Sequence, residues 1–147
     1  MSERELSIIV KRILESRNLG VLGTLDKVGP YQSLVAFVSS KDLKSLVFST
    51  ATNTRKYTNF KTCPQVSFLI DTRSNSEKDF HECIVITAFG KVKEVRKEVK
   101  NSTLSLYLSK HPLLEDFVKS PSCALFEIHV KKYLVVTEFQ KVVELKV

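Results

Sequence analysis

The sequence contains no tryptophan, one methionine and four glycines, and its cysteines number only three. The cysteines, Cys63, Cys83 and Cys123, are far apart, odd in number and never in a CxxC spacing, so neither a disulfide framework nor a zinc-binding motif is expected. We interpret them as small thiols in a reducing compartment. Histidine is scarce as well: His81, His111 and His129 are too scattered to predict a metal site.

Long apolar runs are missing too. No run approaches the roughly 18 residues of a membrane-spanning helix, and charged residues are spread through the N-terminal segment MSERELSIIVKRILESRN. Because a signal peptide needs an apolar centre, we expect a cytoplasmic protein. The composition, 43% hydrophobic and 27% charged, is typical of a globular chain. The length of 147 residues predicts a single domain, 1–147.

The formal net charge is +7, but the basic residues are dispersed along the chain. A nucleic-acid-binding protein usually has a concentrated basic stripe with interleaved aromatic residues, and none is visible. The dispersed excess favours solubility and anionic ligands. We therefore predict no nucleic-acid partner, and a basic nucleic-acid-binding module remains the less favoured alternative.

Apolar periodicity predicts a chain dominated by strands. Ser2 and Glu5 form a capping-box pattern ahead of an amphipathic N-terminal helix, and a second helical pattern covers residues 96–110. Strand patterns occupy residues 19–25, 65–71 and 83–95 and most of 124–147. No βαβ repeat is present. The expected fold is mainly β, a small antiparallel barrel of six or seven strands with about three short helices.

Residues 30–61 form the most informative segment. Two apolar runs, Leu34–Val38 and Leu46–Phe48, predict a hairpin that leads through a polar loop into a short helix. Asn53 is the expected N-cap, because its side-chain oxygen can accept an N–H group of the first turn. The loop gathers hydroxyl and amide side chains immediately before two cations: Ser49, Thr50, Thr52, Asn53, Thr54, Arg55 and Lys56.

This pattern predicts anion binding at a helix N-terminus, where backbone N–H groups and the helix dipole favour a phosphate. The segment has no glycine, so it is not a P-loop. The alternative is an ordinary capped helix with two solvated basic residues.

The order of strand, turn, strand and then S-T-x-x-x-T-R-K resembles the FMN-binding segment of pyridoxamine 5'-phosphate oxidases and their split-barrel relatives. The segments Cys63–Ile70 and Ala88–Val92 resemble two further strands of that family. Roughly residues 18 to 95 are covered in register, and the motif is moderately specific.

The resemblance implies a split barrel that binds FMN, as a homodimer with the cofactor at the interface and with a small-molecule substrate or electron donor. By the same resemblance Thr54, Arg55 and Lys56 would hold the flavin phosphate. Ser49 and Thr50 would reach the phosphate or the ribityl chain, beside the expected cap Asn53. The residues expected beside the flavin ring are Ser33, Leu34 and Val35.

The sequence also departs from the family. The oxidases carry basic residues at the positions of Ser33 and Val38, and they end in a Trp-rich segment with an Arg-x-His motif; this chain has neither. The expected function is therefore an FMN-binding flavoprotein, an oxidoreductase acting on a small acceptor, rather than the vitamin oxidase itself. Three alternatives stay open: a non-catalytic FMN carrier or sensor, a relative that binds deazaflavin or haem, and the basic nucleic-acid-binding module. Haem would take an axial ligand from the histidines.

Overall fold

The computed structural model describes residues 1–147. All strands belong to one antiparallel sheet in the order β3-β2-β1-β4-β5-β6-β7, and pairing of β3 with β6 closes the first six strands into a barrel. β7 pairs with β6 alone, outside the closed ring. This confirms the predicted mainly β barrel. The strands are β1 (Leu19–Asp26), β2 (Gly29–Ser39), β3 (Ser45–Ala51), β4 (Gln65–Asp71), β5 (Val85–Glu94), β6 (Cys123–Thr137) and β7 (Lys141–Lys146).

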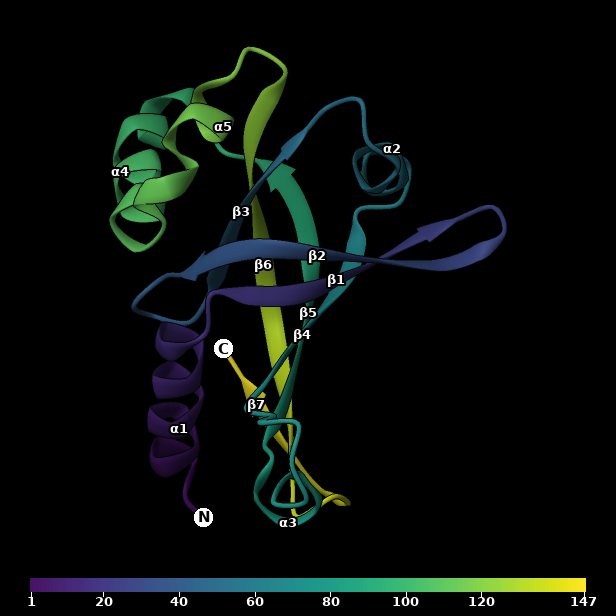
Figure 1. The fold of residues 1–147 in the computed structure, drawn as a ribbon, viewed down its shortest axis with the longest axis vertical. Coiled ribbons are helices and arrows are strands. Elements are labelled where there is room, and N and C mark those ends of the chain that lie inside the picture. Colours follow the sequence, from purple (N-terminus) through teal and green to yellow (C-terminus); the bar gives the residue numbers. More distant parts are fainter.

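The helices lie around the barrel (Figure 1). Figure 1 shows α1 alongside its lower part, α4 and α5 together at the upper left, and α2 at the upper right. None of them combines the length and apolar character that crossing a membrane requires. The sequence does not predict the short α3. The helices are α1 (Glu3–Ser16), α2 (Arg55–Thr62), α3 (Asp79–Glu82), α4 (Lys100–Lys110) and α5 (Glu115–Lys119), with 3₁₀ turns η1 (Lys97–Val99) and η2 (Pro112–Leu114).

Alternating apolar side chains fill the barrel interior. A cluster of 23 buried residues includes aromatic rings from four different strands. The rings of Phe37 and Phe68 meet edge to face with centroids 5.2 Å apart, and those of Phe48 and Phe126 lie 5.9 Å apart. Because side chains occupy the centre of a barrel of this size, a ligand has to bind on its outside.

The N-terminal helix α1 has the predicted capping box. The backbone N–H of Ser2 donates to the Glu5 carboxylate at 2.8 Å, and the backbone N–H of Glu5 donates to the Ser2 hydroxyl at 3.1 Å. At the other end of α1, Lys110 Nζ donates to the carbonyls of Leu14 and Arg17. These bonds fix the end of α1 against α4, since the last carbonyls of a helix have no partners within it.

A second apolar cluster lies on the outer face of the barrel, under α4 and α5. Val38 of β2 and Val47 of β3 pack there against Tyr107 of α4 and Val118 of α5. Val38 is buried in this cluster. The helices thus cover the region where β2 and β3 are paired.

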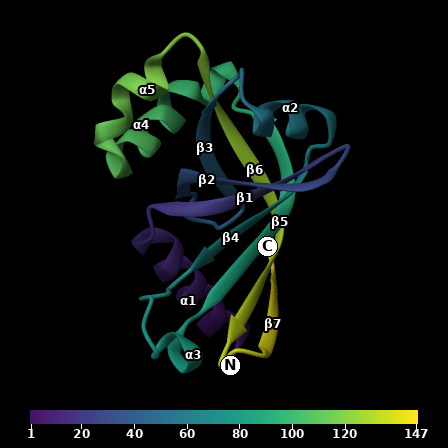
Figure 2. The same ribbon diagram turned by 45° about the vertical axis from the view of Figure 1, so that its right-hand side comes forward.

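The pairing of β2 changes along its length. Residues 29–36 pair with β1, whereas β3 is paired only with Phe37–Ser39. Beyond that point β3 continues along β6. Figures 1 and 2 show β2 and β3 diverging, with α2 beyond the end of β3. The barrel is therefore split between the first part of β2 and the last part of β3. β2 begins at Gly29, so it extends ahead of the apolar run Leu34–Val38.

Candidate functional site

The first turn of α2 is capped by Thr54 and not by Asn53, which corrects the prediction. Thr54 is extended, with φ −101° and ψ 157°, and its Oγ1 accepts the backbone N–H of Tyr57 at 3.4 Å. The Thr54 carbonyl already accepts the N–H of Thr58, so the helix begins one residue later than expected. Asn53 lies exposed in the loop before the cap.

The start of α2 presents hydrogen-bond donors that the protein itself does not satisfy. The backbone N–H groups of Arg55 and Lys56 have no acceptor in the chain, and the Lys56 ammonium forms no ion pair. The first turn of this eight-residue helix contains no acidic residue. Donors, helix dipole and positive charge therefore all favour an anion at this position.

The guanidinium of Arg55 is held in a defined orientation. Its Nε and Nη2 donate to Asp26 Oδ2 at 2.9 Å and 2.6 Å, and it lies 4.7 Å from the ring centre of Tyr31. The other Asp26 oxygen accepts the backbone N–H groups of Val28 and Gly29. These backbone bonds, Val28 first, together with the Arg55 guanidinium hold the pKa of Asp26 below its usual range.

The sequence predicts Asp26 only as a turn residue, and Tyr31 only as part of a strand. Both are essential to the geometry of Arg55. The Asp26–Gly29 turn has a local sequence signal, but nothing in the sequence indicates a partner so far along the chain. The ion pair forms because the hairpin of β1 and β2 reaches the first turn of α2.

The hydroxyl groups predicted to face the cofactor are engaged within the protein. Thr50 Oγ1 is buried, 3.2 Å from Thr54 Oγ1 and 3.2 Å from the Ala51 carbonyl. Ser49 Oγ donates to the Ala124 carbonyl of β6 at 3.1 Å. Thr50 therefore supports the turn that carries the cap, and Ser49 supports the pairing of β3 with β6.

The free edge of β2 lies along the split. The Phe37 N–H donates to the Asn18 carbonyl, and the Tyr31 carbonyl accepts from the Thr24 hydroxyl. Odd-numbered residues of β2 therefore direct their backbone groups toward β1. Backbone groups alternate sides along a strand, so Gln32 and Leu34 direct theirs into the split. No β3 residue pairs with either one.

The three residues expected beside a flavin ring are therefore not equivalent. Leu34 exposes 66% of its surface and directs its backbone groups into the split. Ser33 and Val35 direct theirs toward β1, and the Val35 side chain is buried in the core. Of the three, Leu34 is placed best to contact a ligand.

The split is thus lined by two kinds of group. The edge of β2 offers backbone donors and acceptors suited to a flat heterocycle, and the start of α2 offers donors and positive charge suited to a phosphate. The structure brings no three side chains of His, Cys, Asp or Glu together in an arrangement that could hold a metal ion.

Solved structures share this fold at low sequence identity. The general stress protein 26 of Bacillus anthracis matches with a TM-score of 0.71 and 17% identity over 97% of this chain and 99% of its own. A Clostridium acetobutylicum protein related to general stress protein 26, described as of the pyridoxinephosphate oxidase family, matches with a TM-score of 0.77 and 15% identity over 100% and 97%.

A haem-binding protein from Mycobacterium smegmatis also has this fold, with a TM-score of 0.84 and 16% identity over 99% of this chain. The chain spans only 58% of the length of that protein. A search of curated proteins finds no match. The family model described as pyridoxamine 5'-phosphate oxidase matches residues 9–137, which include the whole closed barrel. The chain therefore belongs to the pyridoxamine 5'-phosphate oxidase family.

Proposed function

We propose that the protein binds FMN in the split between β2 and β3 and acts as an oxidoreductase that transfers electrons or hydride to a small acceptor. The observation that carries this proposal is the start of α2, where an oriented Arg55 and Lys56 adjoin two unsatisfied backbone N–H groups. Family membership supports the same assignment. A phosphate at this position would gain charge-assisted hydrogen bonds.

The residues present fit a flavin mononucleotide. Arg55, Lys56 and their backbone N–H groups would bind the phosphate, and the free backbone groups of Gln32 and Leu34 would meet the edge of the ring. The flavin would supply the redox chemistry, while the protein supplies binding, orientation and the electrostatic environment. Thr54 would contribute by fixing the start of the helix through its bonds to Tyr57 and Ala51.

We also propose that a second copy of the chain completes the site, in a cytoplasmic homodimer. The outer face of β1 and β2 carries exposed apolar side chains, with Leu19 51% and Leu34 66% exposed. A second subunit over this face would bury them and would enclose the split, which is open in a single chain. Sedimentation equilibrium measures the molar mass in solution and tests the dimer independently of the cofactor. Twice the chain mass of 16.7 kDa is expected.

Haem is the second candidate, because one protein with this fold is described as haem-binding. Haem iron needs an axial ligand. His111 is buried with Nε2 2.7 Å from the Phe37 carbonyl, so it is already engaged. His81 and His129 are exposed and are the histidines that could serve. A haem complex would show a Soret band that is lost on replacing one of them.

The decisive experiment is the visible absorption spectrum of the purified protein before and after addition of FMN. The wild type should show flavin bands, and Arg55→Ala/Lys56→Ala should bind FMN about 100-fold more weakly, since two charge-assisted bonds of about 1.5 kcal/mol each are lost. Arg96→Ala/Lys97→Ala is the matched control, because it removes an adjacent arginine–lysine pair that is exposed elsewhere.

The outcomes separate the alternatives. Failure of the wild type to take up FMN would refute the proposal. Uptake of a deazaflavin or of haem instead would show which of these two cofactors the protein binds. Bound FMN that neither NADH nor NADPH reduces would indicate a carrier or sensor. Salt-sensitive nucleic-acid binding without a chromophore would indicate the basic module.

A further inference from the structure

A pocket of about 490 Å³ lies between α2 and the hairpin of β1 and β2, which Figures 1 and 2 show side by side. Its volume is within the range of about 300–1,000 Å³ that is usual for small-molecule sites. We call it the α2 pocket. One wall is the hairpin segment 25–28, and the other consists of Thr58, Asn59, Thr62 and Cys63.

Asn59 places a hydrogen-bond acceptor at the α2 pocket. It is polar, yet only 5% of the residue is exposed. Its Nδ2 donates to Thr24 Oγ1 at 3.0 Å, and its Oδ1 accepts no hydrogen bond from the chain. Arg17 Nε is the only completely enclosed side-chain nitrogen or oxygen without a partner, so Asn59 Oδ1 retains contact with the pocket.

The hydrogen bonds of Thr24 fix which end of the Asn59 amide faces the pocket. Thr24 is buried, and its hydroxyl donates to the Tyr31 carbonyl at 3.4 Å. Because a hydroxyl has a single proton, Thr24 Oγ1 can only accept from Asn59. The amide nitrogen therefore faces Thr24 and the amide oxygen is left for a ligand. A buried acceptor without a donor is unfavourable, so a ligand N–H would supply what Asn59 lacks.

The rest of the α2 pocket offers further acceptors, apolar surface and no net charge. Thr58 and Thr62 donate their hydroxyl protons to the carbonyls of Thr54 and Thr58, so only their oxygen lone pairs remain for a ligand. The hairpin wall contributes two apolar side chains, and the charges of its one acidic and one basic residue cancel. The pocket therefore suits a neutral molecule that donates hydrogen bonds.

We propose that the α2 pocket binds a neutral, flat heterocycle that carries an amino group, as adenine does. The amino group would donate to Asn59 Oδ1, and the ring would lie between the hairpin wall and α2. The size suits such a ligand, because a cavity of about 150 Å³ is enough to hold benzene.

The α2 pocket is separate from the sites proposed above. Gln32 and Leu34, whose backbone groups lie along the split, do not line it. Neither does Leu19, which with Leu34 is proposed to contact a second subunit. Binding in the pocket therefore requires neither the flavin nor the dimer.

The test is a titration of the ¹⁵N-labelled protein with adenosine, followed by the amide resonances. Saturable shifts are expected at the backbone amides of Val28, Thr58 and Thr62 and at the side-chain amide of Asn59. Purine riboside has the same ring and sugar without the amino group. It should bind about tenfold more weakly, since roughly 1.4 kcal/mol corresponds to a factor of ten. Equal affinity for the two nucleosides would contradict the proposal.

Variants locate the site. Asn59→Ala should weaken adenosine binding about tenfold and leave purine riboside unchanged, because only adenosine donates to Asn59. Thr62→Trp gives a second test if Asn59→Ala does not fold: Thr62 is exposed, and the larger side chain should fill the pocket and abolish adenosine binding. Lys61→Trp is the matched control, since this exposed neighbour does not line the pocket. Wild-type affinity in Thr62→Trp would overturn the proposal.

Cys63 gives an independent readout in the wild-type chain. It lines the α2 pocket, whereas Cys83 and Cys123 do not, and all three are free and partly exposed. Saturating adenosine should suppress the reaction of Cys63 with N-ethylmaleimide and leave the other two rates unchanged. An unchanged rate at Cys63, or equal slowing at all three cysteines, would contradict binding in this pocket.

The FMN proposal and this one can fail separately. Lys56→Ala leaves the Arg55–Asp26 ion pair intact, so it should weaken FMN binding and keep adenosine binding. A wild-type protein that binds adenosine in the α2 pocket but never takes up FMN would leave the pocket standing and remove the flavin. Displacement of adenosine by FMN, with shifts at Gln32 and Leu34, would place the nucleoside in the split and overturn the proposal.

Discussion

The two halves of β2 differ in what lies beside them. At Phe37–Ser39 the strand is paired with β3, packed against the core and covered by α4 and α5. At residues 29–36 it is paired only with β1, and Leu34 is exposed. One strand therefore provides both a sealed part of the barrel and an open edge.

The difference shows how a small barrel can offer a binding site without opening its core. The backbone groups at the open edge are available because β3 leaves β2 to follow β6, so no hydrogen bond of the closed half is given up. The closed half contributes to the core, and the proposed binding site lies along the open half. Substitutions in the two halves should therefore have separable effects.

The largest difference is expected between Phe37→Ala and Leu34→Ala. Phe37 is fully buried, so its truncation should lower the free energy of unfolding by about 3–5 kcal/mol. Leu34→Ala removes an exposed side chain and should cost less than about 0.5 kcal/mol. Urea unfolding measures both values, and equal costs would show that the open half is covered in the folded chain.

Proline substitution compares the two edges of the open half. Ser33 directs its N–H toward β1, so Ser33→Pro should be about 1–3 kcal/mol more destabilising than Gln32→Pro, because it leaves an acceptor on β1 unsatisfied. Gln32→Pro removes an N–H that has no strand partner. Thermal unfolding of both variants is the measurement. The reverse order would contradict the assigned alternation of the backbone.

The smallest effect concerns the lysine beside the closed half. Lys110 lies with Nζ 4.2 Å from the centre of the Phe37 ring, and burial lowers its pKa from 10.5 to about 8, against the opposing effect of Glu15. The folded state therefore binds fewer protons than the unfolded state between these two values, so stability should rise with pH across that window.

Lys110 is only half-buried, so the gain should be on the order of 1 kcal/mol. Urea unfolding at pH 7 and at about pH 10 measures it, and Lys110→Met should remove the difference. An equal pH dependence in the variant would assign the effect to other groups. The exposed Lys78→Met is a suitable control.

Strand patterns and short motifs were predictable from the sequence because they are local. The strand at residues 65–71 and the Ser2–Glu5 capping box both appear as expected. The N-cap of α2 was placed one residue early, because the segment Thr52–Thr54 offers consecutive residues of cap-forming type. Local preference alone does not choose among them.

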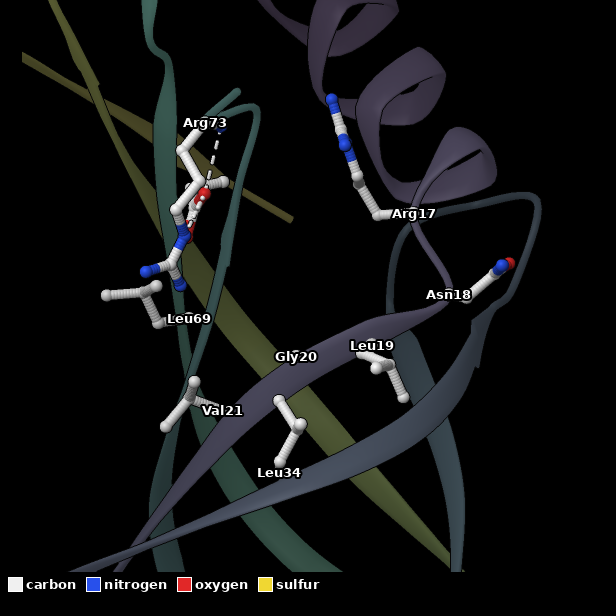
Figure 3. A pocket seen from close by; sticks show the side chains of 9 residues that line it. Arg17, Asn18, Leu19, Gly20, Val21, Leu34, Leu69 and Arg73 are labelled. Atoms are coloured by element: carbon white, nitrogen blue, oxygen red, sulfur yellow. Dashed lines mark hydrogen bonds and ion pairs between the residues drawn. The ribbon is translucent and has the colours of Figure 1, made fainter. Parts of the chain in front are cut away.

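The contacts that shape the candidate sites were not predictable, because they join distant parts of the chain. Asp26 and Arg55 are 29 residues apart and meet only when the hairpin reaches α2. Arg17, the C-cap of α1, and Arg73, two residues beyond β4, line one pocket (Figure 3), and no local pattern marks either one. The open edge of β2 likewise depends on where β3 turns away, a property of the whole barrel.

The edge strand β7, which pairs with β6 alone, affects how the protein behaves at high concentration. Its outer edge has no strand partner, and such an edge can template pairing with a strand of another molecule. Exposed Lys141, Glu144 and Lys146 are distributed along it. Because charged side chains on an edge strand disfavour intermolecular pairing, we expect this edge to resist strand addition from another molecule.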